Sequence, residues 1–402
     1  MSDIEVVFVE GIRTAFGRMG GTIRDIPASK LAAIGIRGLV EKTKISEKAR
    51  VDGVFLGSAA HCSVALNPAR WAALDAGLGW ETSASYVEMQ CGSAIDAINH
   101  AAWKIKAGAA DVIIAGGMES YSQIPAKFSM SLPPYRLVPP MPLKLSLSPV
   151  AEEQIGMGLT AENLQVLYGI PREAADEFAY HSQMRAKAAW EGGKFEGEIV
   201  PVVIPATRKT PEIVFDRDEH LRPETTLEGL TKLPPAFKKD GTVTAGNASG
   251  RNDGAAFVLM MRGDRARELG YEPLARWLCG ADCGVDPKIM GISPAFAVLK
   301  ALKMAALAIE DMDVMECNEA FAVQNLAVIE EIQRQSGSRI DRGKWNPLGG
   351  AIAFGHPNGA SGARVAMFAM RELARRDGRY GFFSSCCGGG LGVASVIENL
   401  RR

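Results

Sequence analysis

Short apolar runs alternate with amphipathic stretches over the first third of the chain. The runs predict buried strands at residues 4–9, 53–57, 84–88 and 111–115, and the stretches predict helices at 28–41, from Pro68 onward and at 92–106. In the last of these helices, Ile95, Ile98, Ala102 and Ile105 fall on one face, at offsets of 0, 3, 7 and 10 positions. Strands and helices that alternate at this spacing indicate parallel strand pairing, and therefore an α/β fold.

The regular pattern ends near residue 120. Seven of the 21 prolines fall in one short stretch, where each removes a backbone donor and disfavours both a helix and a central strand. They are Pro125, Pro133, Pro134, Pro139, Pro140, Pro142 and Pro149. Helical patterns return at 157–193, and residues 201–250 are again rich in turns. We interpret residues 121–250 as an inserted loop domain.

The α/β pattern resumes at residues 255–261 and continues to the C-terminus. A predicted strand–turn–helix at 349–375 corresponds to the one around Cys91, and a predicted strand at 382–385 corresponds to that at 112–115. The sequence therefore predicts two similarly wound halves that flank the loop domain. The first half comprises residues 1–120 with 251–270, and the second comprises residues 271–402.

Composition excludes several classes of function. The 402 residues carry 45 Lys and Arg against 46 Asp and Glu, so no global positive field attracts nucleic acid or an anionic membrane. No apolar run approaches the ~20 residues of a membrane span, and the acidic N-terminus does not resemble a secretory signal. Seven cysteines are too few for a disulfide scaffold, and Cys279 and Cys283 lack the second pair of a zinc site. We expect a cytoplasmic enzyme with reduced thiols and no metal.

Cys91 is the first candidate for chemistry. It lies where a predicted strand turns into an Ala-rich helix, in Gln90-Cys91-Gly92-Ser93. Free amide groups and the dipole at a helix start favour negative charge, so we expect a lowered thiol pKa and a nucleophilic thiolate. The alternative is a small buried apolar side chain, which is the commonest role of a free cysteine.

Three further segments carry candidate groups. His356 lies in a glycine-rich turn (355–362) and is a natural base or hydrogen-bond donor, unless the turn is merely structural. Cys386 follows a predicted strand and precedes Gly388-Gly389-Gly390, whose backbone N–H groups can cradle an oxyanion. Asn318 ends a predicted strand before a helix, where a polar side chain is more often a cap than a catalyst.

Taken in order, these segments resemble the thiolases, and the likeness spans nearly the whole chain. The motifs are Cys91, Asn318-Glu319-Ala320-Phe321, His356 in Gly-His-Pro-x-Gly-x-Ser-Gly, and Cys386-x-Gly-Gly-Gly. Thiolases cleave 3-ketoacyl-CoA with CoA, or run the reverse Claisen condensation of two acyl-CoA molecules. The resemblance implies a five-layer α-β-α-β-α sandwich of two similar halves, with the loop domain over the CoA site.

The resemblance also implies a role for each catalytic group. Cys91 would attack the acyl thioester and hold the acyl group. His356 would activate Cys91 and donate to the thioester oxygen of acetyl-CoA, where Asn318 would position a water. Cys386 would remove the α-proton in synthesis, or return it in cleavage. The backbone N–H groups of Cys91 and Gly388 would stabilise the tetrahedral intermediate.

Binding residues and assembly follow from the same resemblance. Contacts to CoA would come from Ser249 on the pantetheine arm, from Arg222 near the nucleotide phosphates, and from Met157, Phe321 and Ala248. CoA is a substrate, so no cofactor and no metal are implied, and thiolases are commonly homodimers or homotetramers. The expected partners are acyl-CoA and CoA, with neither nucleic acid nor membrane.

A few positions depart from frequent thiolase choices. Gly156 replaces the histidine of biosynthetic members, and Glu88 stands where many have asparagine, although we expect its carboxylate to face away from the thiol. Leu348 and Asn358 are unusual around the histidine loop. The proline-rich stretch 133–149 should line the acyl pocket and matches the usual pattern poorly, which leaves the preferred chain length open.

Two alternatives differ in chemistry. Decarboxylating ketoacyl synthases share the fold but carry histidine or asparagine in place of the second cysteine, so Cys386 argues against them. A non-catalytic acyl-CoA or lipid-binding relative could lose a catalytic group, yet all four are present. The sequence therefore favours an active acyl-CoA C-acyltransferase.

Overall fold

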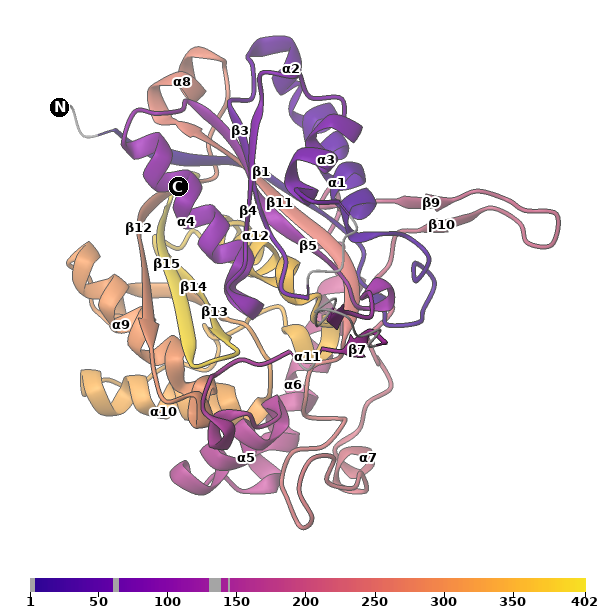
Figure 1. Ribbon diagram of the computed structural model, residues 1–402. Helices are drawn as coiled ribbons and strands as arrows, with labels where there is room; N and C mark the ends of the chain where they lie inside the picture. The colour runs from indigo at the N-terminus through magenta and orange to yellow at the C-terminus, as the bar shows by residue number, and fades with distance from the viewer. Residues whose placement is uncertain (1–3, 61–64, 130–138, 144) are drawn as a thin grey trace, which may run out of the picture.

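A computed structural model describes residues 4–60, 65–129, 139–143 and 145–402 (Figure 1). The predicted elements of the first third are confirmed as β1 (Val6–Thr14), α1 (Ala28–Thr43), β3 (Gly53–Gly57), α3 (Pro68–Asp75), β4 (Ser83–Val87), α4 (Ser93–Lys106) and β5 (Val112–Ser120). Short elements between them are β2 (Gly17–Arg18), α2 (Ile45–Lys48) and a 3₁₀ turn, η1 (Gln90–Gly92). Pro68 opens α3 as predicted, and the Asn67 side chain caps it by accepting from the Arg70 N–H at 2.9 Å.

The first half is completed by β11 (Asn252–Arg262) and α8 (Gly263–Glu268), which follow the intervening segment in the chain. The elements of the second half are β12 (Ala275–Gly284), α9 (Ser293–Ala305), β13 (Met312–Cys317), α10 (Ala322–Ser336), α11 (Ala351–Phe354), α12 (Asn358–Arg375), β14 (Tyr380–Cys387) and β15 (Leu391–Asn399). The segment between the halves contains β6 (Phe128–Ser129), β7 (Met141–Pro142), α5 (Met157–Tyr168), α6 (Arg172–Glu191), β8 (Ile199–Val200), β9 (Val202–Ile204), β10 (Ile213–Phe215) and α7 (Leu227–Thr231).

The two halves share one strand pattern. In the N-terminal half-sheet, β1 and β11 pair antiparallel, β11 and β5 pair antiparallel, and β5, β3 and β4 run parallel. In the C-terminal half-sheet, β12 and β15 pair antiparallel, as do β15 and β14, and β14 is parallel to β13. An antiparallel contact of β1 with β12, from Val6–Trp277 to Phe8–Ala275, joins them into one sheet. The predicted repetition of winding is confirmed.

Helices form three layers around the two half-sheets. Helices α4 and α12 lie between them, where Ile95 and Met367 share an apolar core with Val258 of β11 and Val393 of β15 (Figure 1). Helices α1 and α3 cover the outer face of the N-terminal half-sheet, and α9 and α10 cover that of the C-terminal one. Because a Cβ on Gly362 of α12 would lie 2.7 Å from the Ile95 amide nitrogen, glycine is required where the central helices touch. This is the predicted five-layer sandwich.

One predicted element is wrong. The sequence predicts a strand at the start of 349–375, whereas the chain there forms the short helix α11, and only Trp345 makes a single parallel bridge to Met315 of β13. Asn346 (φ 42°) and Gly349 (φ 81°) adopt left-handed conformations that an extended strand does not contain. The backbone therefore leaves the sheet edge after one residue.

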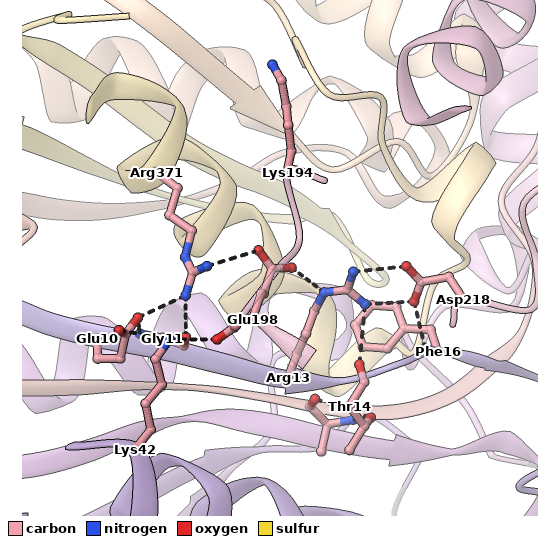
Figure 2. Close-up of polar contacts among 12 residues, drawn as sticks. Glu10, Gly11, Arg13, Thr14, Phe16, Lys42, Lys194, Glu198, Asp218 and Arg371 are labelled. Carbon is pink, nitrogen blue, oxygen red and sulfur yellow. Dashed lines mark hydrogen bonds and ion pairs between the residues drawn. The ribbon is translucent and has the colours of Figure 1, made fainter. Parts of the chain in front are cut away.

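A buried ion network connects the core to the intervening segment (Figure 2). Arg13 on β1 has no exposed surface, and its guanidinium donates to Glu198 Oε1 at 2.5 Å and to both oxygens of Asp218 at 2.7 and 2.9 Å. Asp218 also accepts from the Phe16 N–H at 2.8 Å. Burial alone lowers the pKa of Arg13, but the two carboxylates raise it further than burial lowers it. The network fixes residue 218 close to the segment that carries His220 and Arg222.

Removing one partner of this network is expected to destabilise the protein strongly. In Asp218→Asn the buried guanidinium loses its bidentate partner, so the free energy of unfolding should fall by about 3–5 kcal/mol. Urea denaturation followed by circular dichroism measures the change. Glu228→Gln is the control, because the Glu228–Lys232 pair is exposed and its loss should not shift the midpoint measurably. Equal midpoints for Asp218→Asn and the unaltered protein would contradict the prediction.

Other features of the intervening segment bear on function. The β9–β10 hairpin projects away from the body of the molecule (Figure 1). Pro133 and Pro134 lie outside the described residues, and the limits of the loop domain stay a prediction. Among the helices that the structure describes, none is long and apolar enough to cross a membrane.

Candidate active site

The turn between β4 and α4 presents Cys91. Gln90 has a φ of 48°, an uncommon conformation for a residue with a side chain, and Ser93 Oγ donates to the Gln90 carbonyl at 2.6 Å while accepting from the Met89 N–H at 2.9 Å. A Cβ on Gly92 would lie 2.5 Å from Cys387 Sγ, so the turn has no room for a larger residue. This sharp turn keeps part of Cys91 exposed at the start of the helix.

The loop before α12 holds His356. Its Nδ1 lies 2.6 Å from Ser361 Oγ, and that hydroxyl lies 3.1 Å from the Pro357 carbonyl. Because the carbonyl can only accept, the hydroxyl proton is assigned to it, and Nδ1–H then donates to Ser361. The His356 Nε2 is left as an acceptor and faces Asn318 Nδ2 at 3.4 Å. The buried imidazole is thus oriented to take up a proton at Nε2.

Contacts between distant segments bring these loops together. The Asn358 Nδ2 donates to Cys91 Sγ at 3.2 Å across 267 positions of sequence. The Ser385 hydroxyl on β14 lies 3.3 Å from the Cys91 carbonyl. Glu119 on β5 accepts from the N–H groups of Ala59 and Gly359 at 2.8 and 3.0 Å, which ties the loop of α12 to the N-terminal half. The candidate site is therefore built from both halves of the fold.

The pKa of Cys91 moves opposite to the sequence-based expectation. Burial, then Glu119 and more weakly Glu88, raise the pKa of the thiol to about 12, although the N–H groups of Cys91 and Gly388 act in the other direction. The expectation of a lowered pKa is therefore wrong, because burial and carboxylates outside the turn outweigh its amides. Glu88 accepts from the Gln90 N–H at 2.7 Å, and its carboxylate still opposes the thiolate.

His356 is also neutral at rest. Burial and then the positive charge of Arg364 lower the pKa of its imidazole to about 3. With the thiol pKa near 12, the pair is a neutral thiol and a neutral imidazole at pH 7, not an ion pair. A nucleophilic attack by Cys91 would therefore require its proton to move as the sulfur forms the new bond.

This protonation state predicts how Cys91 reacts with iodoacetamide. The thiolate is the reactive form, and below its pKa its fraction rises about tenfold per pH unit. With a pKa of about 12, the alkylation rate of Cys91 should climb without a plateau between about pH 6 and 9. Mass spectrometry of the Cys91 peptide over time gives the rate. A plateau that begins near pH 5 would reveal a thiolate–imidazolium pair and contradict the prediction.

Cys386 and Cys387 point to opposite faces of β14. Cys386 has no exposed surface, packs into the core beneath α9 and α10, and lies close enough to Cys91 for a charge there to oppose its ionisation. Burial raises its pKa well above the ordinary value, and the thiols of Cys91, Cys317 and Cys387 add to this. Cys387 packs under Gly92 in the central layer. The structure thus brings the Cys386 sulfur to the neighbourhood of the nucleophile.

Asn318 does not act as a helix cap. Its backbone N–H donates to the Ser384 carbonyl at 2.9 Å, and Phe321 is the capping position of α10, without a side-chain bond. Its side-chain oxygen lies 3.5 Å from Arg364 Nη2, and its amide nitrogen faces His356. The cap interpretation is excluded, and the side-chain amide instead contacts the imidazole of His356 and the guanidinium of Arg364.

A cleft opens beside the thiol. Its volume is about 630 Å³. Its lining includes Gln90, Gly388 and Ile124, together with Leu145 and Leu147 from the proline-rich stretch. Gly388 starts the turn between β14 and β15, where Gly389 and Gly390 both have a φ of 84°. The turn leaves the Gly388 N–H directed at the Cys91 sulfur.

The residues assigned to CoA fall in two places. Ala248 bridges to Phe321, and the Ser249 N–H donates to the Ala320 carbonyl at 3.0 Å, so Ala248, Ser249 and Phe321 lie together. Met157 opens α5 and packs against the same core. Arg222 is exposed, and its backbone N–H donates to Gln183 Oε1. Within the described part of the chain, no side-chain hydrogen bond joins Arg222 to the other four.

Sequence reasoning missed Phe237 and Asn358 as site residues. The Phe237 ring is 46% exposed, lies 6.1 Å from the Phe321 ring, and fills the space in which a Cβ on Gly158 would stand. For Phe237, the available sequence signal was an aromatic residue followed by Lys238 and Lys239 in a turn-rich segment. For Asn358, the signal was its departure from the usual residue in the histidine loop.

A cysteine on a strained turn, a buried imidazole whose Nε2 is an acceptor and backbone N–H groups on the sulfur are features typical of acyl-transfer enzymes with a cysteine nucleophile. No cluster of three or more potential metal ligands occurs among the described residues.

Comparisons with known proteins identify the family. The model of the thiolase N-terminal domain matches residues 6–264, and that of the thiolase C-terminal domain matches residues 271–399. The acetyl-CoA acetyltransferase of Chromobacterium violaceum is 44% identical over 98% of this chain and 100% of its own length. A crystal structure of Bacillus anthracis acetyl-CoA acetyltransferase has a TM-score of 0.90 at 40% identity, covering 98% of this chain and 99% of that one. Human mitochondrial 3-ketoacyl-CoA thiolase in complex with CoA has a TM-score of 0.89 at 39% identity, covering 98% of each chain.

The chain belongs to the thiolase family and is an acyltransferase enzyme. The predicted family and fold are confirmed. These relatives match over nearly their full length and are named as enzymes, so they do not support the alternative of a non-catalytic binding protein.

Proposed function

We propose that this thiolase transfers acyl groups between CoA thioesters through an acyl-enzyme on Cys91. It would cleave 3-ketoacyl-CoA with CoA, or condense two acyl-CoA molecules in reverse. The observation that carries the proposal is the environment of one sulfur atom. Cys91 Sγ accepts from Asn358 at 3.2 Å and faces the Gly388 N–H. The buried imidazole of His356, whose Nε2 is an acceptor, lies two residues before Asn358 in the chain.

In the first half-reaction, the Cys91 thiol would give its proton to His356 Nε2 as the sulfur bonds to the thioester carbon of acyl-CoA in synthesis, or to the 3-keto carbon of 3-ketoacyl-CoA in cleavage. The N–H groups of Cys91 and Gly388 would stabilise the oxyanion of the tetrahedral intermediate, and loss of one such donor typically costs ~100- to 1,000-fold in rate. The intermediate collapses as the leaving group, CoA thiolate in synthesis or the acetyl-CoA carbanion in cleavage, takes up the proton of the Cys386 thiol. This leaves Cys386 as a thiolate and the proton from Cys91 on His356 Nε2. In synthesis the weakly basic CoA thiolate can also leave unprotonated.

In the second half-reaction of synthesis, Cys386 would remove a proton from the α-carbon of acetyl-CoA. His356 Nε2–H and a water positioned by Asn318 would stabilise the negative charge on the thioester oxygen. The carbanion then attacks the acyl carbon, a carbon–carbon bond forms, and the Cys91 thiolate leaves and takes its proton back from His356 Nε2. In cleavage the same groups act in the opposite order, with Cys386 as the acid.

We propose that CoA lies along the group around Phe321. Its pantetheine arm would contact Ser249, Ala248, Met157 and Phe321, with Phe237 as an additional contact, and Arg222 would approach the phosphates. The acyl chain would occupy the cleft lined by Ile124, Leu145 and Leu147. These three apolar side chains in the lining support fatty-acid metabolism, including β-oxidation, as the setting. No metal or further cofactor is required by these steps.

We also propose a homodimer or homotetramer in the cytoplasm. Strand β4 forms one end of the sheet, and its residues are partly exposed. Trp71 and Trp80, next to it in the chain, are 42% and 86% exposed, and a second copy could cover them.

Steady-state thiolysis tests the proposed function. Acetoacetyl-CoA and longer 3-ketoacyl-CoA esters are mixed with CoA and the protein, and the acyl-CoA products are quantified by chromatography. Turnover with at least one ester is expected, and the series gives the preferred chain length. The absence of turnover with every ester, in both directions, would overturn the proposal.

A further inference from the structure

Asn358 makes an unusual contact for a residue at a helix start. It is the first residue of α12, after the capping position Pro357, and an asparagine side chain commonly bonds to nearby backbone groups. Its amide nitrogen instead donates to Cys91 Sγ at 3.2 Å, and among the described residues this is the only hydrogen bond of its side chain. The start of α12 is therefore connected directly to the nucleophilic atom of the other half.

The sulfur that it contacts lies in an unfavourable field. The carboxylates of Glu119 on β5 and Glu88 before η1 oppose a negative charge there, as does burial. The backbone N–H groups of Cys91 and Gly388 act against them. Asn358 is the side-chain donor on this sulfur in the part of the chain that the structure describes, and it comes from a different element than either carboxylate.

The strength of this hydrogen bond changes during the reaction. A donor to an ionised acceptor forms a bond about twice as strong as one to a neutral acceptor, so the amide stabilises the thiolate more than the thiol. In the acyl-enzyme the sulfur belongs to a thioester and is a weak acceptor. An interaction that is strongest while the sulfur carries charge lowers the activation barrier of the step. An equally strong interaction with the resting thiol would not do so.

We propose that Asn358 is a catalytic residue that stabilises the Cys91 thiolate as it forms in acylation and again as it leaves in deacylation. The inference rests on the proposed function, and it assigns to this chain a side-chain donor on the nucleophile in addition to the two backbone groups. Asn358 forms no covalent bond during the reaction. At the end of each turnover its amide again donates a hydrogen bond to the neutral Cys91 thiol.

Three variants separate this role from a structural one. Asn358→Leu keeps a similar volume without a donor, Asn358→Asp places an acceptor that ionises against the sulfur, and Asn358→Ser is too short to reach it. We expect the second-order rate of Cys91 alkylation by iodoacetamide at pH 8 to fall about tenfold in Asn358→Leu and Asn358→Ser, and further in Asn358→Asp. A purely structural role of Asn358 would not rank the alkylation rates of the three variants in this order. Glu88→Gln is the opposite control, because it removes a carboxylate and should increase the rate.

Acylation by acetyl-CoA is measured in the same proteins by rapid quench and intact mass. We expect a 10- to 100-fold decrease in Asn358→Leu, with unchanged circular dichroism. If the unaltered protein alkylates but is never acylated, the proposed function fails and the alkylation series still tests the contact. If it is acylated and the folded Leu and Ser variants alkylate and acylate at its rates, the inference is overturned. Asn358→Ser decides the question if Asn358→Leu does not fold.

Discussion

Replacing Cys91 by alanine or serine will abolish the covalent acyl adduct. The unaltered protein, incubated with acetyl-CoA, should gain one acetyl group, and the rate of acylation should fall by at least about 10⁴-fold in either variant, as expected when the nucleophile of a cooperating catalytic group is removed. Serine is no substitute, because its hydroxyl is a far weaker acid than the thiol and the two carboxylates near residue 91 oppose an alkoxide even more strongly. Intact mass spectrometry detects the adduct, and digestion locates it.

The control for this experiment is Cys283→Ser. The Cys283 thiol is also partly exposed, but it bonds to the Ser293 carbonyl and lies outside the site. This variant should acquire the acetyl group at the normal rate. An adduct that persists in Cys91→Ala would identify a different nucleophile, and the absence of an adduct on every protein would favour a binding function.

Replacing Cys386 by serine will separate the two half-reactions. The variant should still form the acyl-enzyme, since Cys386 makes no hydrogen bond to Cys91 or His356 among the described residues, but it should exchange the α-protons of acetyl-CoA about 10²- to 10⁴-fold more slowly. The reason is the position of its sulfur, which is buried close to Cys91 on the strand that leads into the Gly388 turn. Proton exchange is followed in deuterated water by mass spectrometry or NMR.

Cys387→Ala provides the matched control. Its thiol is on the opposite face of β14, packed against the turn of Cys91 in the central layer, so its removal should leave proton exchange within a few-fold of normal. Undiminished exchange in Cys386→Ser would remove Cys386 from the role of base. Loss of both half-reactions in Cys386→Ser, with the fold intact, would instead place it in the acylation step.

Local patterns predicted the elements that carry the site. The apolar runs at 53–57 and 84–88 and the stripe of Ile95, Ile98 and Ile105 depend on the period of a strand or helix, which the chain determines by itself. These periods alone are enough to place Cys91 at the start of a helix. The strand expected at the start of 349–375 failed because the left-handed conformation of Asn346 and Gly349 has no signature in hydrophobic periodicity.

The sequence by itself determined the order of the elements, the repeated winding and the chemical types of the candidate groups, because these follow from local periodicity and side-chain identity. Only the tertiary structure decided the charge state of Cys91, the acceptor nitrogen of His356 and the contact from Asn358 to the sulfur. A pKa depends on every charge and donor within a few ångströms, and Glu119, Gly388 and Asn358 reach residue 91 from separate parts of the chain. Distance in space governs these interactions, and spacing along the chain does not specify it.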